Sequence, residues 1–377
     1  MSSVGAVIAG YGLFTPYGIG VDACWEGLMA KQCTINECTR FDMSAMRSKK
    51  AAFIPELGHS GKTSLFMQMV SRLFEETLPP LPEDTFLLTA STTGEIDYLE
   101  KKVLYGQGDA EESALSGLTH KVAKAAGIKR SGLVISAACA SSLAACARGL
   151  SLIRSGVEDC ILVVAGDVVS EFVFSGFSSL MALDVNSSKP FDKERAGLSL
   201  GEAAGYVLLM SRERAEKEGI KAVFSLTGSG QSNDANHMTG PSRDGAGLSR
   251  AVLKALESAE IERDTPAFIA AHGTGTQYND SMEMKGYKKV FSSPLPVFSV
   301  KGAMGHPMAG AGLVQLLVAV QCLKTGMIPP TVGLSDVDPE ADGWASPHAV
   351  PFKGNHGIVV NAGFGGINAA LCLEGEI

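Results

Sequence analysis

The sequence predicts an α/β protein built from two similar halves, in which mostly parallel sheets are covered by helices. Short apolar, β-branched runs alternate with helix-length segments, as they do in βαβ units. Two pairs of segments echo each other in the same order: AVIAGYG from residue 6 with AVFSLTGSG from 222, and GEAAGYVLL from 201 with GGINAALCL from 365. Such echoes indicate a duplicated fold, although glycine-rich turns before buried strands also look alike without duplication.

The individual elements follow from local patterns. Buried strands are predicted near residues 6, 86, 133 and 160, where short apolar runs occur. A helix is predicted over Ser141–Arg154, because apolar residues recur at helical spacing and Ser155-Gly156 is a stop signal. The charged segment 211–222 predicts a helix that joins the halves, which we place at residues 1–215 and 216–377.

Composition narrows the class of protein. The 377-residue chain carries 32 Lys and Arg against 40 Asp and Glu, and its net charge of -8 argues against a broad nucleic-acid surface. No basic segment precedes the first apolar residues, and no apolar run approaches the ~18 residues that span a bilayer. We therefore expect a cytoplasmic protein without a membrane span. Its eight cysteines fit neither a disulfide framework nor paired zinc spacing.

Cys139 is the first candidate for chemistry. It lies in VISAACASSLAAC, where a strand-type run gives way to the predicted helix. At a helix N-terminus, unpaired backbone N–H groups and the helix dipole lower the pKa of a thiol and favour the nucleophilic thiolate. Free cysteine is also among the most buried residue types, so this segment alone leaves a purely structural role open.

Two histidines occupy comparable positions in the second half. His272 ends the short apolar strand in FIAAHGTGTQYND, and His306 and Pro307 begin the long apolar helix after VFSVKGAMG. With approximate two-fold symmetry between the halves, the helix starts at Cys139 and His306 converge on one site. A lone histidine is more often structural, but two beside a thiol favour catalysis, and the helix dipole should keep them neutral.

This combination of groups suits carbon–carbon bond formation on thioesters. Two neutral histidines can donate N–H groups to a developing enolate oxygen, while two backbone N–H groups receive a thioester oxyanion. The turn Asn361–Asn368 follows the strand-type run GIVV and could supply such N–H groups, with Phe364 as a bulky wall. Its glycines equally suit an ordinary tight turn.

The motifs, in this order, resemble those of the elongating, Cys-His-His type of β-ketoacyl-[acyl-carrier-protein] synthase, in the thiolase-like superfamily. The resemblance runs nearly end to end and rests on AVIAGYGLFTPYG at the start, AACASS around Cys139, KPFDKERAGLSLGEAAGYVLL at 189–209, SNDANHMTGPSRDG at 232–245, HGTGTQYND at 272–280, KGAMGHPMAGAG at 301–312 and GFGGINAAL at 363–371. Thiolases use a second cysteine, and the initiating synthases an asparagine, at positions where this chain offers His272 and His306.

The resemblance implies a thiolase-like fold, in which duplicated βαβαβαββ halves form a five-layered α-β-α-β-α architecture. It also implies an acyltransferase: a decarboxylative Claisen condensation joins an acyl-cysteine enzyme and malonyl-acyl carrier protein into 3-ketoacyl-acyl carrier protein. By this resemblance Cys139 accepts the acyl chain, and His272 and His306 promote malonyl decarboxylation and stabilise the enolate. Lys301 matches the lysine that supports the active-site network.

Further roles also follow from the resemblance. The backbone N–H groups of Cys139 and Phe364 form the oxyanion hole, Phe364 is the gate near the acyl pocket, and Thr274 and Thr276 meet the phosphopantetheine arm. No metal and no dissociable cofactor are implied, because the substrates themselves carry the phosphopantetheine. The implied partners are an acyl carrier protein, malonyl and acyl thioesters, and a second ketosynthase-like subunit in a homodimer or heterodimer.

Three departures from the family pattern indicate a specialised enzyme for a polyketide, polyene or unusual fatty acid. The family's glutamate nine residues after the second histidine is Gln315, the aromatic residue two positions before the gate is Ala362, and segment 108–127 is shorter than in housekeeping synthases. They also fit an alternative, a non-catalytic or weakly active partner subunit like a chain-length factor. The intact cysteine, histidines and lysine argue against that alternative.

Acidic carrier proteins need a local basic surface, which a chain of net charge -8 must concentrate in one place. The candidate run is Arg47, Lys49, Lys50 and Lys62. An ordinary solvated face explains the same residues equally well.

Overall fold

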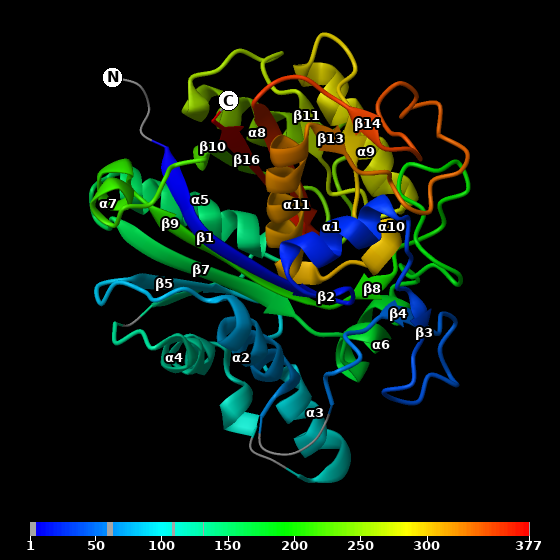
Figure 1. The fold of residues 1–377 in the computed structure, drawn as a ribbon. Coiled ribbons are helices and arrows are strands. Elements are labelled where there is room, and N and C mark those ends of the chain that lie inside the picture. Colours follow the sequence, from blue (N-terminus) through cyan, green and yellow to red (C-terminus); the bar gives the residue numbers. More distant parts are fainter. Residues whose placement is uncertain (1–4, 59–62, 108–109, 131, 377) are drawn as a thin grey trace.

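The computed structural model describes residues 5–58, 63–107, 110–130 and 132–376 (Figure 1). Its centre is an eleven-stranded sheet in the order β12-β11-β15-β16-β10-β1-β9-β7-β5-β6, with β2 paired to β1. The strands are β1 (Ala6–Thr15), β2 (Gly18–Ile19), β5 (Phe86–Ala90), β6 (Leu133–Ile135), β7 (Cys160–Asp167), β9 (Ala203–Met210), β10 (Phe224–Asn233), β11 (Phe268–Ala270), β12 (Val297–Phe298), β15 (His356–Gly363) and β16 (Ile367–Gly375).

The remaining elements are helices and short paired strands. The helices are α1 (Val21–Met29), α2 (Leu65–Thr77), α3 (Ile96–Tyr105), α4 (Leu115–Ala126), α5 (Ser141–Arg154), α6 (Glu171–Ser179), α7 (Arg212–Lys217), α8 (Ala246–Ala259), α9 (Gln277–Val290), α10 (Lys301–Met304) and α11 (Ala311–Thr325), with 3₁₀ turns at Ala110–Ser113, Met308–Gly310 and Phe364–Gly366. The short strands are β3 (Asn36–Glu37), β4 (Lys50–Ala52), β8 (Leu200–Gly201), β13 (Met327–Ile328) and β14 (Val350–Pro351).

The sheet has the same strand order on both sides of its centre. From the antiparallel pair β1–β10 outward, one side runs β9, β7, β5, β6 and the other runs β16, β15, β11, β12. Pairing directions also match, since the two inner pairs of each side are antiparallel and the two outer pairs are parallel. The echoed segments of the sequence are thus β1 with β10 and β9 with β16. The division at residue 215 stays a prediction.

Mostly parallel sheets were the wrong expectation for the inner strands. β15 and β16 are joined directly by the turn Phe364–Gly366, and a connection this short permits only antiparallel pairing. The alternation of apolar runs with helical segments indicates which strands are buried, but it does not indicate their direction. The prediction of parallel inner strands was wrong because it used this alternation alone.

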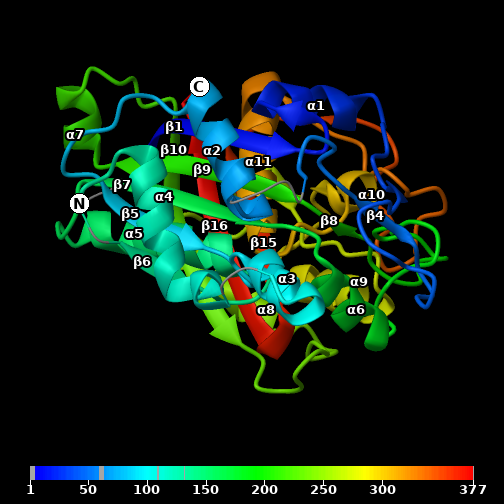
Figure 2. The same ribbon diagram turned by 90° about the horizontal axis from the view of Figure 1, so that it is seen from below.

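Helices divide the molecule into the expected five layers. α5 and α11 lie in the middle, where each contacts strands of both sides (Figure 1). On the outer face of the N-terminal strands, α2 contacts β1 and β9 and α4 contacts β5 (Figure 2). α8 covers β10 and β16 on the opposite outer face and packs on α9. The α-β-α-β-α order is confirmed.

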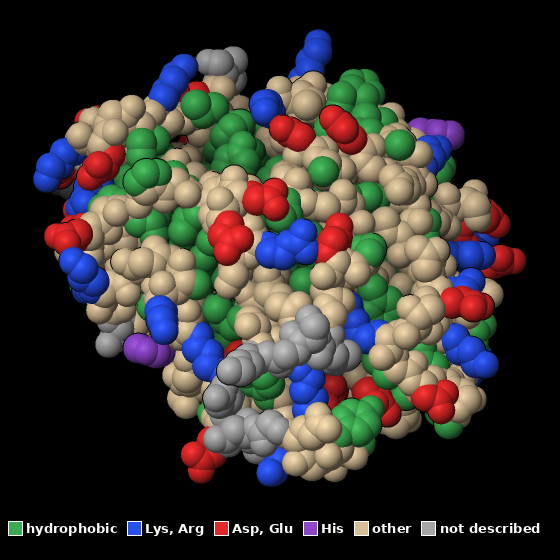
Figure 3. Space-filling model, turned by 60° about the horizontal axis from the view of Figure 1, so that its bottom comes forward, with side chains coloured by type: hydrophobic (Ala, Val, Ile, Leu, Met, Phe, Trp, Pro, Cys, Tyr) green, Lys and Arg blue, Asp and Glu red, His purple; other side chains and the backbone are tan. Residues whose placement is uncertain are grey.

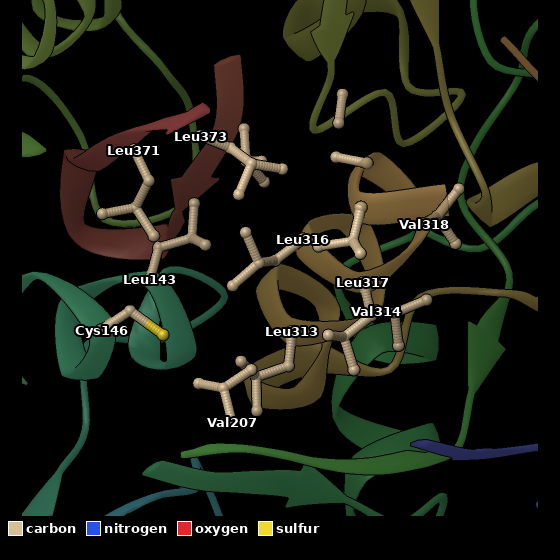
Figure 4. Close-up of a cluster of buried hydrophobic side chains, with 14 of the residues drawn as sticks. Leu143, Cys146, Val207, Leu313, Val314, Leu316, Leu317, Val318, Leu371 and Leu373 are labelled. Atoms are coloured by element: carbon tan, nitrogen blue, oxygen red, sulfur yellow. The ribbon is translucent and has the colours of Figure 1, made fainter. Parts of the chain in front are cut away.

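The central helix α11 is mostly apolar around its circumference, apart from polar residues such as Gln315 and Gln321, because it is buried on all sides. Leu313, Leu316 and Leu317 belong to one core cluster with side chains of α5 and β16, and Figure 4 shows Leu316 directed towards Leu143 and Leu371. The window Met308–Thr325 is long and apolar enough to cross a membrane, so the expectation that no run approaches this length was wrong. Within the fold 83% of that window is buried, which explains its composition.

The strand β6 is less buried than the sequence predicted. The strands near residues 6, 86 and 160 are largely buried as predicted, but Leu133 of β6 is 47% exposed and the next two residues are half-buried. β6 is the last strand of the sheet and has a paired neighbour, β5, on one side only in the described chain. The predicted helix Ser141–Arg154 is confirmed with the same bounds, as α5.

Asp167, at the end of β7, connects the N-terminal sheet to the turn after His306. Its buried carboxylate accepts hydrogen bonds from the Ser91 hydroxyl, from the Thr92 hydroxyl at 2.6 Å and from the Ala309 N–H at 2.8 Å. Burial raises the pKa of this carboxyl, and the hydrogen bonds oppose that rise. The carboxylate therefore holds a segment of the second half against a strand of the first.

We expect Asp167→Ala to lower the free energy of unfolding by about 3 kcal/mol, because several buried donors lose their acceptor at once. Urea denaturation followed by circular dichroism measures this change. The matched control is Asp336→Ala, which breaks an exposed ion pair with Lys193 at 2.9 Å and should cost less than about 1 kcal/mol. Equal losses in the two variants would contradict this role of Asp167.

Candidate active site

Cys139, His272 and His306 come together in the interior. The cysteine Sγ and a nitrogen of each histidine ring all lie within 4.8 Å of one another, and the two rings are edge to face with centroids 5.2 Å apart. Cys139 lies between β6 and α5, His272 follows β11, and His306 precedes α11. All three side chains are buried. The convergence expected from the repeated halves is therefore present.

The same three residues have the chemical types that bind zinc. The Lys301 ammonium lies 3.4 Å from Nδ1 of His272, and a cation there repels a second cation. The absence of a metal from the reaction stays a prediction.

The turn before α5 presents Cys139 to two backbone N–H groups. Ala138 has a φ of +49°, an unusual conformation for a residue with a side chain. The Ser141 hydroxyl stabilises this turn by accepting from the Ala137 N–H at 2.8 Å and donating to the Ala138 carbonyl at 2.6 Å. The backbone N–H groups of Phe364 and of Cys139 itself favour the thiolate by lowering the pKa of the thiol. These are the two groups predicted for the oxyanion hole.

The sequence predicted that His306 begins the long helix, and this prediction was wrong. α10 ends at Met304, a 3₁₀ turn covers Met308–Gly310, and α11 begins only at Ala311. The φ of +43° at Met308 interrupts the helical path. His306 is held through its backbone N–H, which donates to the Ser199 carbonyl at 2.7 Å. Neither of its ring nitrogens has a hydrogen-bond partner among the described residues.

Two carboxylates on α9, which sequence reasoning missed, hold the loop at His272. Glu283 accepts from the N–H groups of His272 at 2.9 Å and Gly273 at 2.6 Å. Asp280 accepts from the Thr274 N–H at 3.1 Å and the Gly275 N–H at 3.2 Å. Their spacing of three residues at the start of a helix was the available signal, since it places both on one face.

Lys301 takes part in the site as predicted from the resemblance. Its Nζ donates to the His272 carbonyl oxygen and lies 3.3 Å from Oε1 of Gln315. Asn361, which the sequence offered only as part of a turn, places its Nδ2 3.3 Å from Nδ1 of His272. Gln315 and Asn361 thus occupy the network where the family pattern led us to expect a glutamate.

The pKa of the Cys139 thiol is raised, whereas the sequence led us to expect a lowered value. Burial raises the pKa of the thiol to about 11, although the Lys301 ammonium opposes this rise. The helix start does not offset the burial of the sulfur. Burial also holds the pKa of His272 and of His306 well below the usual range, with Lys301 acting in the same direction. Both rings are neutral as expected, but the main cause is burial. A neutral imidazole beside a protonated thiol is a suitable base.

A cleft of about 770 Å³ leads to these residues. Thr274 and Thr276 line it, with their hydroxyl oxygens 2.9 Å apart, as do Ala362 and Phe364. The Phe364 ring stacks on Phe177 of α6 with centroids 5.6 Å apart. The predicted pantetheine and gate residues therefore all face the same cleft as the reactive groups.

The predicted basic run does not line this cleft. Arg47 and Lys49 are exposed and Lys50 is half-buried, while Lys62 lies outside the described residues. On the face in Figure 3, described side chains of both signs are interspersed.

An exposed basic residue does line the cleft. Arg243 is part of the lining, and its guanidinium lies 4.6 Å from the ring centroid of Tyr278. These two residues also border a second hollow of about 390 Å³, together with Lys193, Arg195 and Lys285. No local pattern in the sequence indicates this group, because its residues come from three separate segments of the chain.

Family models, curated proteins and solved structures all match this chain to β-ketoacyl synthases. The domain described as "Beta-ketoacyl synthase, N-terminal domain" matches residues 84–215, and "Beta-ketoacyl synthase, C-terminal domain" matches residues 223–335. The chain is 28% identical to 3-oxoacyl-[acyl-carrier-protein] synthase 2 of Vibrio harveyi over 99% of both chains. It is 27% identical to the tetracenomycin polyketide synthase ketoacyl synthase alpha subunit of Streptomyces glaucescens, over 97% of this chain and 96% of that protein. Among solved structures, the ishigamide ketosynthase/chain length factor matches with a TM-score of 0.90 and 28% identity over the full length of both chains.

Proposed function

The chain belongs to the β-ketoacyl synthase family, and from that premise we propose that it condenses an acyl group held on Cys139 with malonyl-acyl carrier protein. The product is 3-ketoacyl-acyl carrier protein. The observation that carries the proposal is the meeting of Cys139, His272 and His306 within 4.8 Å at the end of a cleft. A thiol beside two neutral imidazoles fits acyl transfer followed by decarboxylation.

In the loading step, the Cys139 sulfur attacks the carbonyl carbon of an acyl-carrier thioester. A carbon–sulfur bond to Cys139 forms, and the bond to the pantetheine sulfur breaks. Because the resting thiol is protonated, its proton passes to a neutral histidine and then to the departing carrier thiolate. The N–H groups of Cys139 and Phe364 stabilise the oxyanion that forms between these events.

In the condensing step, the bond between the malonyl α-carbon and its carboxylate breaks and carbon dioxide leaves. The electron pair remains as an enolate, whose oxygen accepts hydrogen bonds from His272 and His306. The α-carbon then attacks the Cys139 thioester, so that a carbon–carbon bond forms and the carbon–sulfur bond to Cys139 breaks. Solvent returns a proton to the cysteine.

The cleft supplies the binding groups for this sequence of steps. Thr274 and Thr276 bind the pantetheine arm, and Phe364, stacked on Phe177, is the gate to the acyl chain. We assign no dissociable cofactor, since the arm arrives with the substrates. Carrier proteins are acidic, and the exposed Arg243 in the cleft lining supports their docking there. Lys193 and Lys285 border the neighbouring hollow, where they pair with Asp336 and Glu340.

A second subunit and a specialised pathway complete the proposal. The exposed edge strand β6 and the exposed side chains Val103 and Tyr105 of α3 support pairing with a ketosynthase-like subunit, in a homodimer or heterodimer. The relatives serve both fatty-acid and polyketide synthesis by their names, and Gln315 and Ala362 favour a polyketide, polyene or unusual fatty acid. We place the reaction in the cytoplasm.

A second candidate function is that of a partner subunit with little activity of its own. The match to a ketosynthase/chain length factor structure and the presence of Gln315 favour it. The assembled cysteine, histidines and lysine favour the catalytic function, because a subunit that only shapes an acyl tunnel needs none of them beside a cleft.

The test is a single-turnover reaction of the purified chain with a panel of acyl-carrier thioesters and malonyl-carrier. We expect mass spectrometry to find one acyl group on the protein and then 3-ketoacyl-carrier, together with release of carbon dioxide. The reaction is repeated with a ketosynthase-like partner encoded by the same organism. Acylation by no donor, with or without the partner, contradicts the catalytic function; acceleration of a partner's reaction by an unacylated chain supports the second candidate.

A further inference from the structure

A chain of amide groups reaches from backbone carbonyls to the ring of His272. It begins at Gln315 on α11, whose Nε2 faces three carbonyl oxygens: Ala270 at 3.1 Å, Ala271 at 2.6 Å and Val360 at 3.0 Å. A carbonyl oxygen can only accept, so the NH₂ group of the glutamine must face these three oxygens. Its Oε1 is therefore directed to the other side.

The orientation of Asn361 follows from that of Gln315. Oε1 of Gln315 lies 2.5 Å from the terminal nitrogen of Asn361, and the Val360 carbonyl oxygen lies 2.8 Å from the same nitrogen. Both neighbours are acceptors. The reverse orientation would place the asparagine oxygen against two other oxygens, so Asn361 must present its NH₂ group.

Nδ1 of His272 faces only donors as a result. It lies 3.3 Å from Nδ2 of Asn361 and 3.4 Å from Nζ of Lys301. Neither an amide NH₂ nor an ammonium can accept a hydrogen bond. A proton on Nδ1 would point at other hydrogens, and a neutral ring therefore carries its proton on Nε2.

We propose that Asn361, oriented by Gln315, is a positioning residue that fixes His272 in the tautomer with its proton on Nε2. The inference rests on the proposed function, in which His272 donates a hydrogen bond to the thioester or enolate oxygen in the cleft. The opposite tautomer would present a lone pair there and repel the developing charge.

A glutamine fits both sides of this position, whereas a carboxylate fits only the side that faces Asn361 and Lys301. Gln315 turns its NH₂ group, which has two hydrogens to donate, towards the three carbonyl oxygens, and its Oε1 accepts from Asn361 and Lys301. A carboxylate at position 315 can only accept, so it would set oxygen against the carbonyls of Ala270 and Ala271.

Nitrogen-15 NMR of histidine-labelled protein reads the tautomer directly. The His272 signals are assigned by their absence from His272→Gln, and we expect Nε2 protonated and Nδ1 unprotonated in the natural protein. Asn361→Asp exchanges the donor for an acceptor of the same shape, which should move the proton to Nδ1. Asn361→Leu removes the donor without offering an acceptor, and should give a mixture. The control is Gln321→Leu, another buried glutamine of α11, bound to Asp22 and outside this network.

Separate assays of the two half-reactions provide the kinetic readout. In Asn361→Asp, kcat for malonyl decarboxylation should fall about tenfold to a hundredfold, with KM for malonyl-carrier unchanged within about threefold. Acyl loading on Cys139 should change little, which shows that the site is folded. Gln315→Leu should reproduce part of the loss, and Gln321→Leu none of it.

A proton on Nδ1 in the natural protein overturns the proposal. So does an Asn361→Asp variant that keeps both the Nε2 proton and the natural decarboxylation rate. If Asn361→Asp does not fold, the natural protein and Asn361→Leu decide the matter by NMR. Failure of the natural protein to load or decarboxylate contradicts the proposed function instead, and the NMR result stands apart from it.

Discussion

Replacing Cys139 with alanine should abolish acyl loading and lower the rate of condensation at least about 10⁴-fold, while malonyl decarboxylation remains measurable. The sulfur is the only group in the cluster that can hold an acyl chain covalently, so its loss removes the intermediate itself. Decarboxylation depends on the hydrogen bonds to the enolate oxygen, and those donors, His272 and His306, are unchanged. Intact-mass analysis measures the loading, and carbon dioxide release measures the decarboxylation.

Cys146 supplies the matched control for this experiment. It lies on α5 seven residues after Cys139, is fully buried, and packs in the core among the side chains shown in Figure 4. Cys146→Ala removes a buried sulfur from the same helix, so it reports any general effect of loosening α5. Loading that is lost in both variants, or in neither, would argue against Cys139 as the nucleophile.

The convergence of the catalytic candidates could be predicted because it depends on topology. A duplicated strand order places the helix start at Cys139 opposite the turn at His306, and His272 at a strand end between them. The bounds of α5 were predictable for a different reason, since its periodicity and its stop at Ser155 are local signals. Sequence patterns report such features because neighbouring residues produce them.

The features that could not be predicted depend on contacts between distant residues. Asn361 meets His272 across 89 positions of the chain, and no local pattern records that meeting. The pKa of Cys139 is another case, because the helix start is visible in the sequence but the burial that outweighs it is not. Strand direction and the exposed edge at Leu133 likewise emerge only when the sheet is assembled.

Lys301→Met should lower the rate of malonyl decarboxylation by about a hundredfold or more and remove a pH dependence from it. The lysine ammonium is fully buried beside His272 and favours negative charge on Cys139 and on the enolate. Burial lowers the pKa of Lys301 to about 8, so the ammonium is present below that pH and is lost as the pH rises through it. The natural enzyme should therefore slow above about pH 8. The methionine variant should be slow on both sides of that value, and a step near pH 8 retained in the variant would assign the dependence to another group.

Lys301→Met, which lowers activity, should maintain or raise the stability of the folded protein at pH 7. The folded-state pKa of Lys301 lies below its unfolded value of 10.5, so the unfolded chain binds the proton more tightly and the stability of the natural protein rises between about pH 8 and 10.5. Below pH 8 the folded protein must bury a charged ammonium, a cost that methionine avoids at nearly the same volume. Lys301→Met should accordingly be at least as stable as the natural protein at pH 7, with an advantage that shrinks towards pH 10. Thermal denaturation at both pH values measures this difference. A variant that is both inactive and strongly destabilised at pH 7 would mean that the lysine is retained for folding, whereas lost activity with retained stability means that the buried charge is kept for catalysis.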